Sequence, residues 1–269
     1  MNRIVAIEES HLPRLLALQQ PLSQAVAASA ADQLAKIKAA ESTWTSTFLQ
    51  KAGKNLIVSL QGLMQRKVYF DWYDWTFKPG TDMLADAINQ AASNSSISGI
   101  LLHVDSPGGF ADSAEAMATA IKNCGKPVVA FIQGMSASAA YWVTAQCAAV
   151  YTSSSQDQVG SIGTYYTHLN SVEALKKYGY DVEIIRAKAS PDKISINEIE
   201  PLTDQTRKQI QTTCDQCQAD FIAALAGRTI KKEATTGNIF KASQAQKLGL
   251  TDGTASLDQA LSALTALYS

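Results

Sequence analysis

Ser138 lies in a turn of small residues that could hold a reactive hydroxyl group. The segment 133–141 reads Gln-Gly-Met-Ser-Ala-Ser-Ala-Ala-Tyr and connects a predicted strand to a predicted helix. A serine in such a turn can attack a carbonyl carbon, and the amide of the next residue, Ala139, can stabilise the resulting oxyanion. The simpler interpretation is a helix N-cap, a common role for serines between a strand and a helix. Ser136 fits that cap, which leaves Ser138 as the candidate nucleophile.

A second turn with the same potential is Asp105-Ser-Pro-Gly-Gly109, directly after a predicted strand. Two glycines allow the backbone to approach a ligand closely and to present its amide groups. The helix that follows would add its positive N-terminal end. These are the components of an oxyanion hole, although an ordinary strand-to-helix loop has the same composition.

The residues alone leave the general base open. His103 precedes the glycine turn and His168 follows the Gly160-Ser-Ile-Gly163 turn, but neither spacing identifies a catalytic triad. A lysine can act instead when burial lowers its pKa toward neutrality, and many lysines are available.

Metal chemistry is not expected, and we predict no cofactor. The four cysteines are Cys124, Cys147, Cys214 and Cys217, and only the last two are close in sequence. A zinc site would need a second such pair or histidines at ligand spacing. We therefore interpret the cysteines as reduced, structural thiols.

Alternating strands and helices must position the two turns, which predicts an α/β fold with a parallel sheet. In such sheets the reactive loops follow the carboxyl ends of the strands. The predicted strands are 55–61, 97–104, 127–132 and 149–152, and the predicted helices begin near Thr81, Ala111 and Ala137.

Two flanking segments have less certain roles in the sequence. Residues 1–52 are predicted as a helical arm, for oligomerisation or with little packing, and residues 53–269 as the main domain. The segment 69–77 holds six aromatic residues and could line a substrate groove or form an apolar flap.

The composition excludes some partners. The net charge of −1 gives no electrostatic footprint for nucleic acid. No apolar run is long enough for a signal peptide or a membrane span, so we expect a cytoplasmic protein.

Four landmarks in order give the chain a resemblance to the signal peptide peptidase A family, from about Asn55 to Ala260. They are Asp105–Gly109, Gly134–Ser138, Gly160–Gly163 and a C-terminal block, Gly227-Arg228 with Ala242–Asp252. The resemblance implies a core similar to Clp protease and crotonase, built from repeated ββα and βα units, with C-terminal helices after it.

The resemblance also implies a Ser–Lys dyad. The family serine falls on Ser138. The family lysine follows a strand, here 182–185, and precedes a Pro-x-Thr, here Pro201–Thr203, which favours Lys193 over Lys188. The hydroxyl that orients the lysine maps to Ser161. The chain departs from the family by Ala139-Ala140 in place of Gly-Gly, and by lacking the usual Ser-Gly start of the lysine region.

The expected activity is that of a serine endopeptidase. Gly109 and Ala139 would supply the oxyanion amides, and an extended peptide would bind as an added strand near Phe110, Val159 and Gly160. The family implies a ring of identical subunits. Members without a membrane anchor process phage or prophage capsid and scaffold proteins, which is the favoured use. Degradation of signal-peptide remnants or other peptides, an inactive assembly module and a crotonase-type acyl-CoA enzyme are the alternatives.

Overall fold

The computed structural model describes residues 47–71 and 75–269. Nearly all of the predicted N-terminal arm, residues 1–46, lies outside the described residues. Leu49–Ala52, which the sequence assigns to that arm, form strand β1 of the central sheet.

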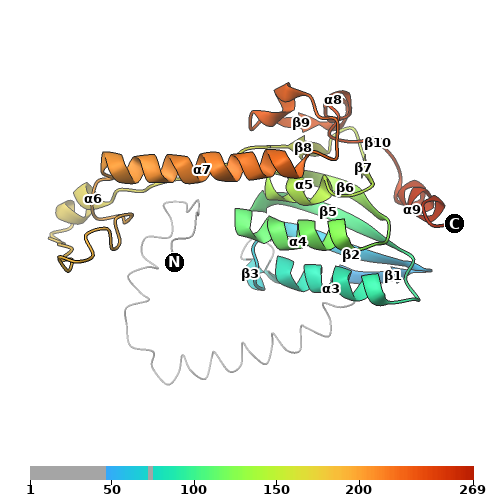
Figure 1. Cartoon of the computed structure of the whole chain (residues 1–269), viewed down its shortest axis with the longest axis horizontal. Helices are drawn as coiled ribbons and strands as arrows, with labels where there is room; N and C mark the ends of the chain where they lie inside the picture. The colour runs from blue at the N-terminus through green and yellow to red at the C-terminus, as the bar shows by residue number, and fades with distance from the viewer. Residues whose placement is uncertain (1–46, 72–74) are drawn as a thin grey trace, which may run out of the picture.

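A mostly parallel sheet forms the centre of the molecule (Figure 1). Its main path runs β1-β2-β5-β6-β7-β10, and β8 and β9 extend it beside the second half of β6. Only the β1–β2 and β8–β9 pairings are antiparallel among the strands of this sheet in the described chain. The bounds are β2 Asn55–Met64, β5 Gly99–Gly109, β6 Val128–Ala137, β7 Ala149–Thr152, β8 Gln158–Gly160, β9 Ile239–Lys241 and β10 Gly253–Thr254.

The central strands are apolar on both sides because helices cover both faces of the sheet. Ile100, Leu101 and Leu102 in β5 are all fully buried, as expected for a strand in a parallel sheet that is covered on both faces. The α/β class predicted from the sequence is confirmed. Both β5 and β6 run further than predicted, so that the two chemistry-bearing turns are the last residues of neighbouring strands.

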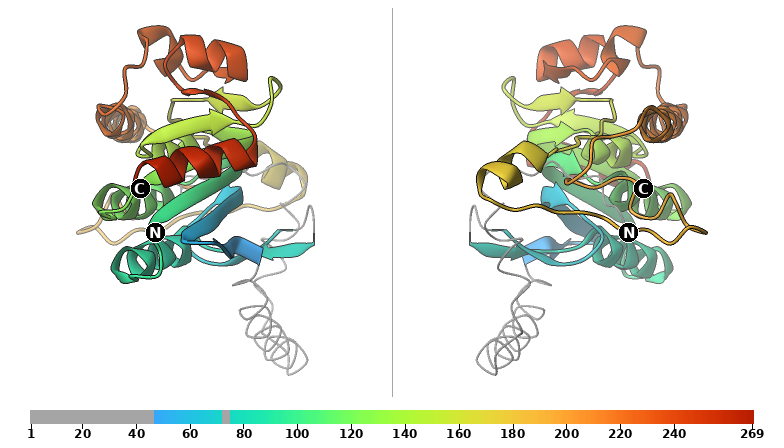
Figure 2. Two further views of the ribbon diagram at one scale, coloured as in Figure 1. Left: turned by 90° about the vertical axis from the view of Figure 1, so that its right-hand side faces the viewer. Right: turned by 90° about the vertical axis from the view of Figure 1, so that its left-hand side faces the viewer.

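The helices form a layer on each side of the sheet. Helices α3 (Thr81–Ser93), α4 (Ala111–Asn123) and α5 (Ala139–Thr144) stack in a row over one face. Helix α9 (Leu257–Ala266) lies across the other face (Figure 2) and packs on β5 and β6. Helix α8 (Ala242–Lys247) and a short 3-10 helix, Lys232–Thr235, lie at the β9 end of the sheet.

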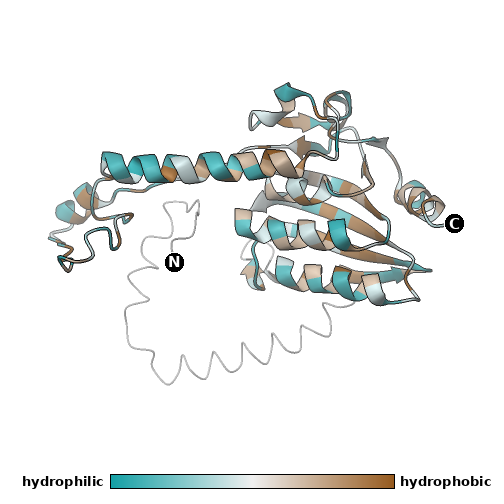
Figure 3. Ribbon diagram, viewed as in Figure 1, coloured by the Kyte–Doolittle hydropathy of each residue, from teal (hydrophilic) through white to brown (hydrophobic). Residues whose placement is uncertain are grey.

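A long arm projects from this body. Helix α7 (Asp204–Ala224) extends away from the sheet, and α6 (Val172–Lys177) lies near its far end (Figure 1). A helix of 21 residues is about 30 Å long at about 1.5 Å per residue. Figure 3 shows that α7 is hydrophilic over most of its projecting length and more hydrophobic near the sheet.

The strand predicted at 182–185 is not present. These residues have no regular secondary structure, and Ile185 is 87% exposed. A strand needs a neighbour to satisfy its backbone groups, and this segment lies on the arm, away from the strands of the sheet.

The aromatic segment forms a two-stranded hairpin, apart from residues 72–74, which lie outside the described residues. Strands β3 (Tyr69–Asp71) and β4 (Thr76–Lys78) pair antiparallel, and the Phe70 ring meets the edges of Trp75 and Phe77. None of the helices in the described chain combines the length and apolar character that crossing a bilayer requires.

Candidate active site

Ser138 has the backbone conformation of a sharply turned residue. Its φ angle is 53°, in the left-handed region that residues other than glycine rarely adopt, and a constraint of this kind is characteristic of functional sites. The chain holds it there because the Ser138 amide donates to the Gly160 carbonyl at 2.9 Å. Ser138 is the N-cap residue of α5, but its side chain makes no capping hydrogen bond.

The predicted cap at Ser136 is wrong. Ser136 is fully buried, and its hydroxyl shares a 3.1 Å hydrogen bond with Thr144 inside the core. No hydrogen bond is made by the Ser138 hydroxyl to any other described residue, so the group is free to react.

The glycine turn packs directly against the serine turn. The buried Ser106 hydroxyl donates to the Gly62 carbonyl at 2.6 Å and accepts from the Gly108 amide at 3.2 Å, which fixes the end of β5. Gly108 has a φ of 91°, and a Cβ there would lie 2.8 Å from Cβ of Ser138. A Cβ at Gly109 would lie 2.1 Å from the Met64 carbonyl oxygen.

If the Gly109 amide is an oxyanion donor, as predicted from the sequence, we expect Gly109→Ala to lower peptide hydrolysis by about 100-fold, because the new methyl group must push the turn away from β2 and misalign that amide. The free energy of unfolding should also fall, by about 1–3 kcal/mol. Steady-state kinetics and thermal denaturation measure the two effects. The control is Gly227→Ala, since a Cβ at Gly227 meets nothing within 4 Å. Equal activity in the two variants would contradict a close approach at residue 109.

A cavity of about 170 Å³ opens beside Ser138. Gly109, Phe110 and Ala139 line it together with Ser138, so these four predicted site residues lie around one cavity. The other lining residues are mainly apolar: Leu63, Ala111, Trp142, Gly163, Thr164, Tyr165, Cys214, Cys217 and Phe221.

Helix α7 supplies a wall of the cavity that the sequence motifs do not predict. Cys214, Cys217 and Phe221 recur at spacings of three and four residues, which places them on one face of the helix. Phe221 is buried and stacks on Trp142 at a ring distance of 4.9 Å. That spacing is the signal that could have identified the wall.

The predicted strand addition at Val159 and Gly160 requires a correction. Strand β8 pairs with β6 on one side and with β9 on the other, so its two edges are already occupied. Both residues are buried. Gly160 instead supports the site through its carbonyl, which accepts a hydrogen bond from the Ser138 amide.

Ser161 directly follows Gly160, which places it beside the serine turn. Its φ is 53°, and its amide donates to the Asn238 carbonyl at 2.7 Å. Lys193, which Ser161 is predicted to orient, lies elsewhere.

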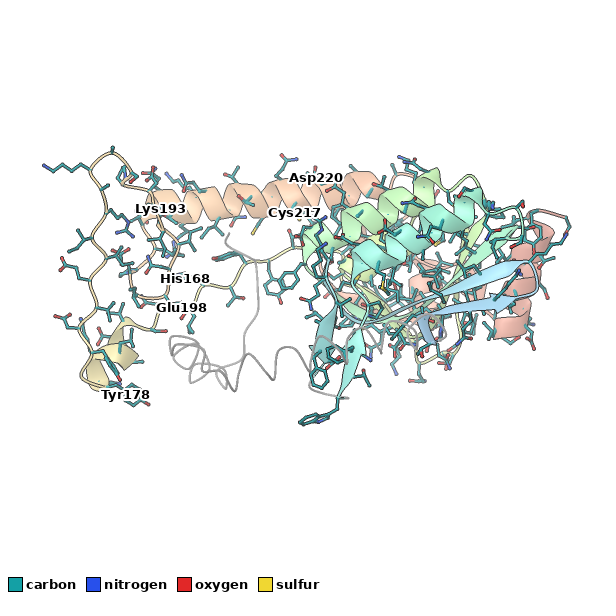
Figure 4. The ribbon with its side chains drawn as sticks, turned by 90° about the horizontal axis from the view of Figure 1, so that it is seen from below. His168, Tyr178, Lys193, Glu198, Cys217 and Asp220 are labelled. Carbon is teal, nitrogen blue, oxygen red and sulfur yellow. The ribbon has the colours of Figure 1, made fainter. Side chains whose placement is uncertain are left out.

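Lys193 is on the arm, at the end of α7 remote from Cys217 (Figure 4). Cys214 on the cavity wall is ten positions after Asp204, the first residue of α7, a rise of about 15 Å along the helix. Lys188 belongs to the same exposed segment as Lys193. The single chain therefore does not bring either lysine to Ser138.

Arg186 organises the loop that carries Lys193. Its guanidinium donates to the carbonyls of Lys193 at 2.7 Å and Ile194 at 3.1 Å, and pairs with the Glu200 carboxylate. The hydrogen bond from Arg186, supported by one from Asn197, lowers the pKa of Glu200 to about 2.

We expect Arg186→Met to expose the segment 186–200 to proteolysis, because two backbone carbonyls and the carboxylate lose their donor. The pair contributes fully above the ordinary Glu200 pKa of 4.5, and its contribution is lost as the pH falls through about 2. Limited digestion of the wild-type protein should therefore leave the loop intact at pH 5. Arg207→Met, on the same arm, is the control. Equal cleavage of both variants would show that Arg186 does not hold the loop.

The two histidines in the described part of the chain, His103 and His168, have partners other than Ser138. His103 shares a 3.0 Å hydrogen bond with Gln133, and His168 bonds to the Asn197 carbonyl at 2.7 Å. Neither lines the cavity at Ser138. Within residues 47–71 and 75–269, no group of three or more His, Cys, Asp or Glu side chains is placed to hold a metal ion.

The chain is similar to proteins named as proteases or as phage head proteins. It is 28% identical to a Methanocaldococcus jannaschii protein named as a protease, over 75% of this chain and 68% of that one. The head-tail preconnector protein GP5 of Enterobacteria phage P21 is 29% identical, over 71% of this chain and 39% of GP5. The capsid assembly protease C of Escherichia phage lambda is 30% identical, over 61% of this chain and 38% of that protein. The chain thus spans well under half of either phage relative.

Solved structures with a similar fold include an enoyl-CoA hydratase/isomerase family member, with a TM-score of 0.47 and 15% identity, over 81% of this chain and 73% of that one. A mutant of a membrane-bound stomatin-specific protease has a TM-score of 0.45 and 14% identity, over 79% of this chain and 85% of that one.

The profile of peptidase family S49 matches residues 120–269, more than half of the chain. The match includes Ser138, the α7 wall of the cavity and the C-terminal block. The chain belongs to peptidase family S49.

Proposed function

We propose that the chain is a serine endopeptidase in which Ser138 attacks the peptide carbonyl and Lys193 acts as the general base. The conformation and position of Ser138 support its assignment as the nucleophile. Its φ is 53°, its side chain makes no capping hydrogen bond, and it lines a mainly apolar cavity. The amides of Gly109 and Ala139 are the proposed oxyanion donors, each contributing about 3 kcal/mol to transition-state stabilisation.

Lys193 reaches Ser138 from a second copy of the chain in this proposal. Within one chain the lysine is exposed on the arm, whereas a lysine acts as a base when burial removes its ammonium group from water. The arm also exposes apolar side chains that a second copy would cover. They are Tyr178 (77% exposed), Tyr180 (57%), Val182 (47%), Ile185 (87%) and Ile194 (51%).

The reaction is acyl transfer to water in two steps. The Lys193 amine takes the Ser138 proton as the oxygen attacks, and then gives that proton to the departing amine, which leaves an acyl-enzyme on Ser138. Water, deprotonated by the same lysine, hydrolyses the ester and restores the serine. Ser161 is the proposed hydroxyl that orients the lysine once the two copies meet.

The proposed substrates are phage or prophage capsid and scaffold proteins. The support is similarity to the phage P21 preconnector and the lambda capsid assembly protease. The apolar cavity favours small or apolar side chains beside the scissile bond. Degradation of cytoplasmic peptides is the alternative use of the same site.

The test is hydrolysis of denatured casein and of a random peptide library by the purified protein, with the new termini identified by mass spectrometry. We expect cleavage after small or apolar residues that is lost in the Ser138→Ala variant. Cleavage that persists in that variant would remove Ser138 from the mechanism.

A further inference from the structure

Two thiols face the cavity beside Ser138. Cys214 and Cys217 are free, half-buried and three residues apart on α7, and both line the cavity that Ser138 lines (Figure 4 labels Cys217). The other two cysteines, Cys124 and Cys147, are buried in the core. Among the described residues, Cys214 and Cys217 are therefore the cysteines that a ligand in the cavity would contact.

The helix spacing decides what the two thiols can bind. Side chains three residues apart on a helix have Cβ atoms about 5–6 Å apart. A disulfide needs a Cβ–Cβ distance of about 3.5–4.5 Å, so closing one would distort α7. A single soft atom bonded between the two sulfurs fits the wider spacing without that distortion.

The number of available ligands indicates which metal ion the two cysteines can bind. Zinc in proteins takes about four ligands, and the described residues provide no third side chain for a cluster here. Cu⁺ is a soft ion that thiolate ligands select, and two thiolates suffice for it. Trp142, Phe221 and Phe110 line the same cavity and offer no hard oxygen ligand from their side chains to compete with the two sulfurs.

We propose that Cys214 and Cys217 form a two-thiolate site for a soft metal ion of the Cu⁺ class, and that an ion bound there closes the cavity beside Ser138. The reaction is Cu⁺ + 2 RSH → [Cu(SR)₂]⁻ + 2 H⁺, in which two S–H bonds are replaced by two Cu–S bonds and no electron is transferred. The proposed binding of the ion rests on the geometry of the cavity alone. The blocking of hydrolysis rests on the proposed function.

The experiment titrates the reduced protein with Cu⁺ under anaerobic conditions against a chromophoric Cu⁺ chelator. The variants are Cys214→Ser, Cys217→Ser and the control Cys124→Ala. We expect one tightly bound Cu⁺ in the wild type and in the control, and at least a 100-fold weaker association in each serine variant. Equal Cu⁺ affinity in the wild type and the serine variants would overturn the site.

A second arm separates this site from the peptidase assignment. Ser138→Ala should bind Cu⁺ as the wild type does, with partial quenching of the tryptophan fluorescence because Trp142 lines the same cavity, whether or not the wild type cleaves peptides. In a protein that does cleave, one equivalent of Cu⁺ should abolish hydrolysis, and the chelator should restore it. Full hydrolysis with the site occupied would overturn the closure of the cavity.

Discussion

Replacing Ser138 with alanine is expected to lower kcat for peptide hydrolysis by about 10⁴-fold or more, because the nucleophile acts as a unit with its base. The fold should remain, since the Ser138 hydroxyl makes no capping hydrogen bond and its backbone is held by the Gly160 carbonyl. Peptide turnover and thermal denaturation, measured on the same preparation, test both statements.

The matched control is Ser136→Ala, two residues earlier in the same turn. That change removes the hydrogen bond between Ser136 and Thr144, whereas the Thr144 hydroxyl keeps its bond to the Tyr141 carbonyl at 3.2 Å. The loss of one bond should cost about 0.5–1.5 kcal/mol of stability. Its activity should stay within about tenfold of the wild type, because Ser136 is not exposed to the cavity. A reversed pattern, with Ser136→Ala inactive and Ser138→Ala active, would identify the wrong serine as the nucleophile.

The second large effect concerns Lys193. The Lys193→Ala variant should be as inactive as Ser138→Ala, but a mixture of the two inactive proteins should regain activity. A site that takes its serine from one copy and its lysine from another is intact in about one quarter of random pairings in an equal mixture. We therefore expect about a quarter of the wild-type rate after the variants are mixed and allowed to exchange subunits.

Two further measurements make the mixing experiment decisive. The Lys188→Ala variant should keep its activity, since the proposed base is Lys193 and not its competitor Lys188. Sedimentation should show assemblies larger than one chain. If the mixture stays inactive although the assemblies have exchanged, the lysine and the serine do not come from different copies.

The part of the site that could be predicted is the part made by the sheet. Neighbouring parallel strands end at the same edge, so the turns after β5 and β6 had to meet there. Ser106 pairs with Ser136 across these strands, and Gly109, Phe110 and Ala139 surround Ser138 as expected. Local pattern and topology were sufficient for these residues.

The arm could not be predicted from the same rules. Its position is set by α7, which is hydrophilic over most of its projecting length, so hydrophobic periodicity carries little information there. The sequence around Val182 is rich in β-branched residues, but a strand depends on a neighbouring strand that a local pattern does not reveal. The pairing of β8 with β9 joins segments about eighty residues apart in the chain, a separation that local patterns do not encode either.

The separation of Ser138 from the arm has a consequence for when the protein can cut. A newly made chain holds the Ser138 hydroxyl at the edge of the sheet and the Lys193 amine near the far end of the 21-residue helix α7. Because a helix of this length is stiff, it cannot fold back to bring the two groups together. On the proposed arrangement the isolated chain is its own zymogen, with no propeptide required. Activity then depends on association of the subunits, and the local subunit concentration determines where and when proteolysis begins.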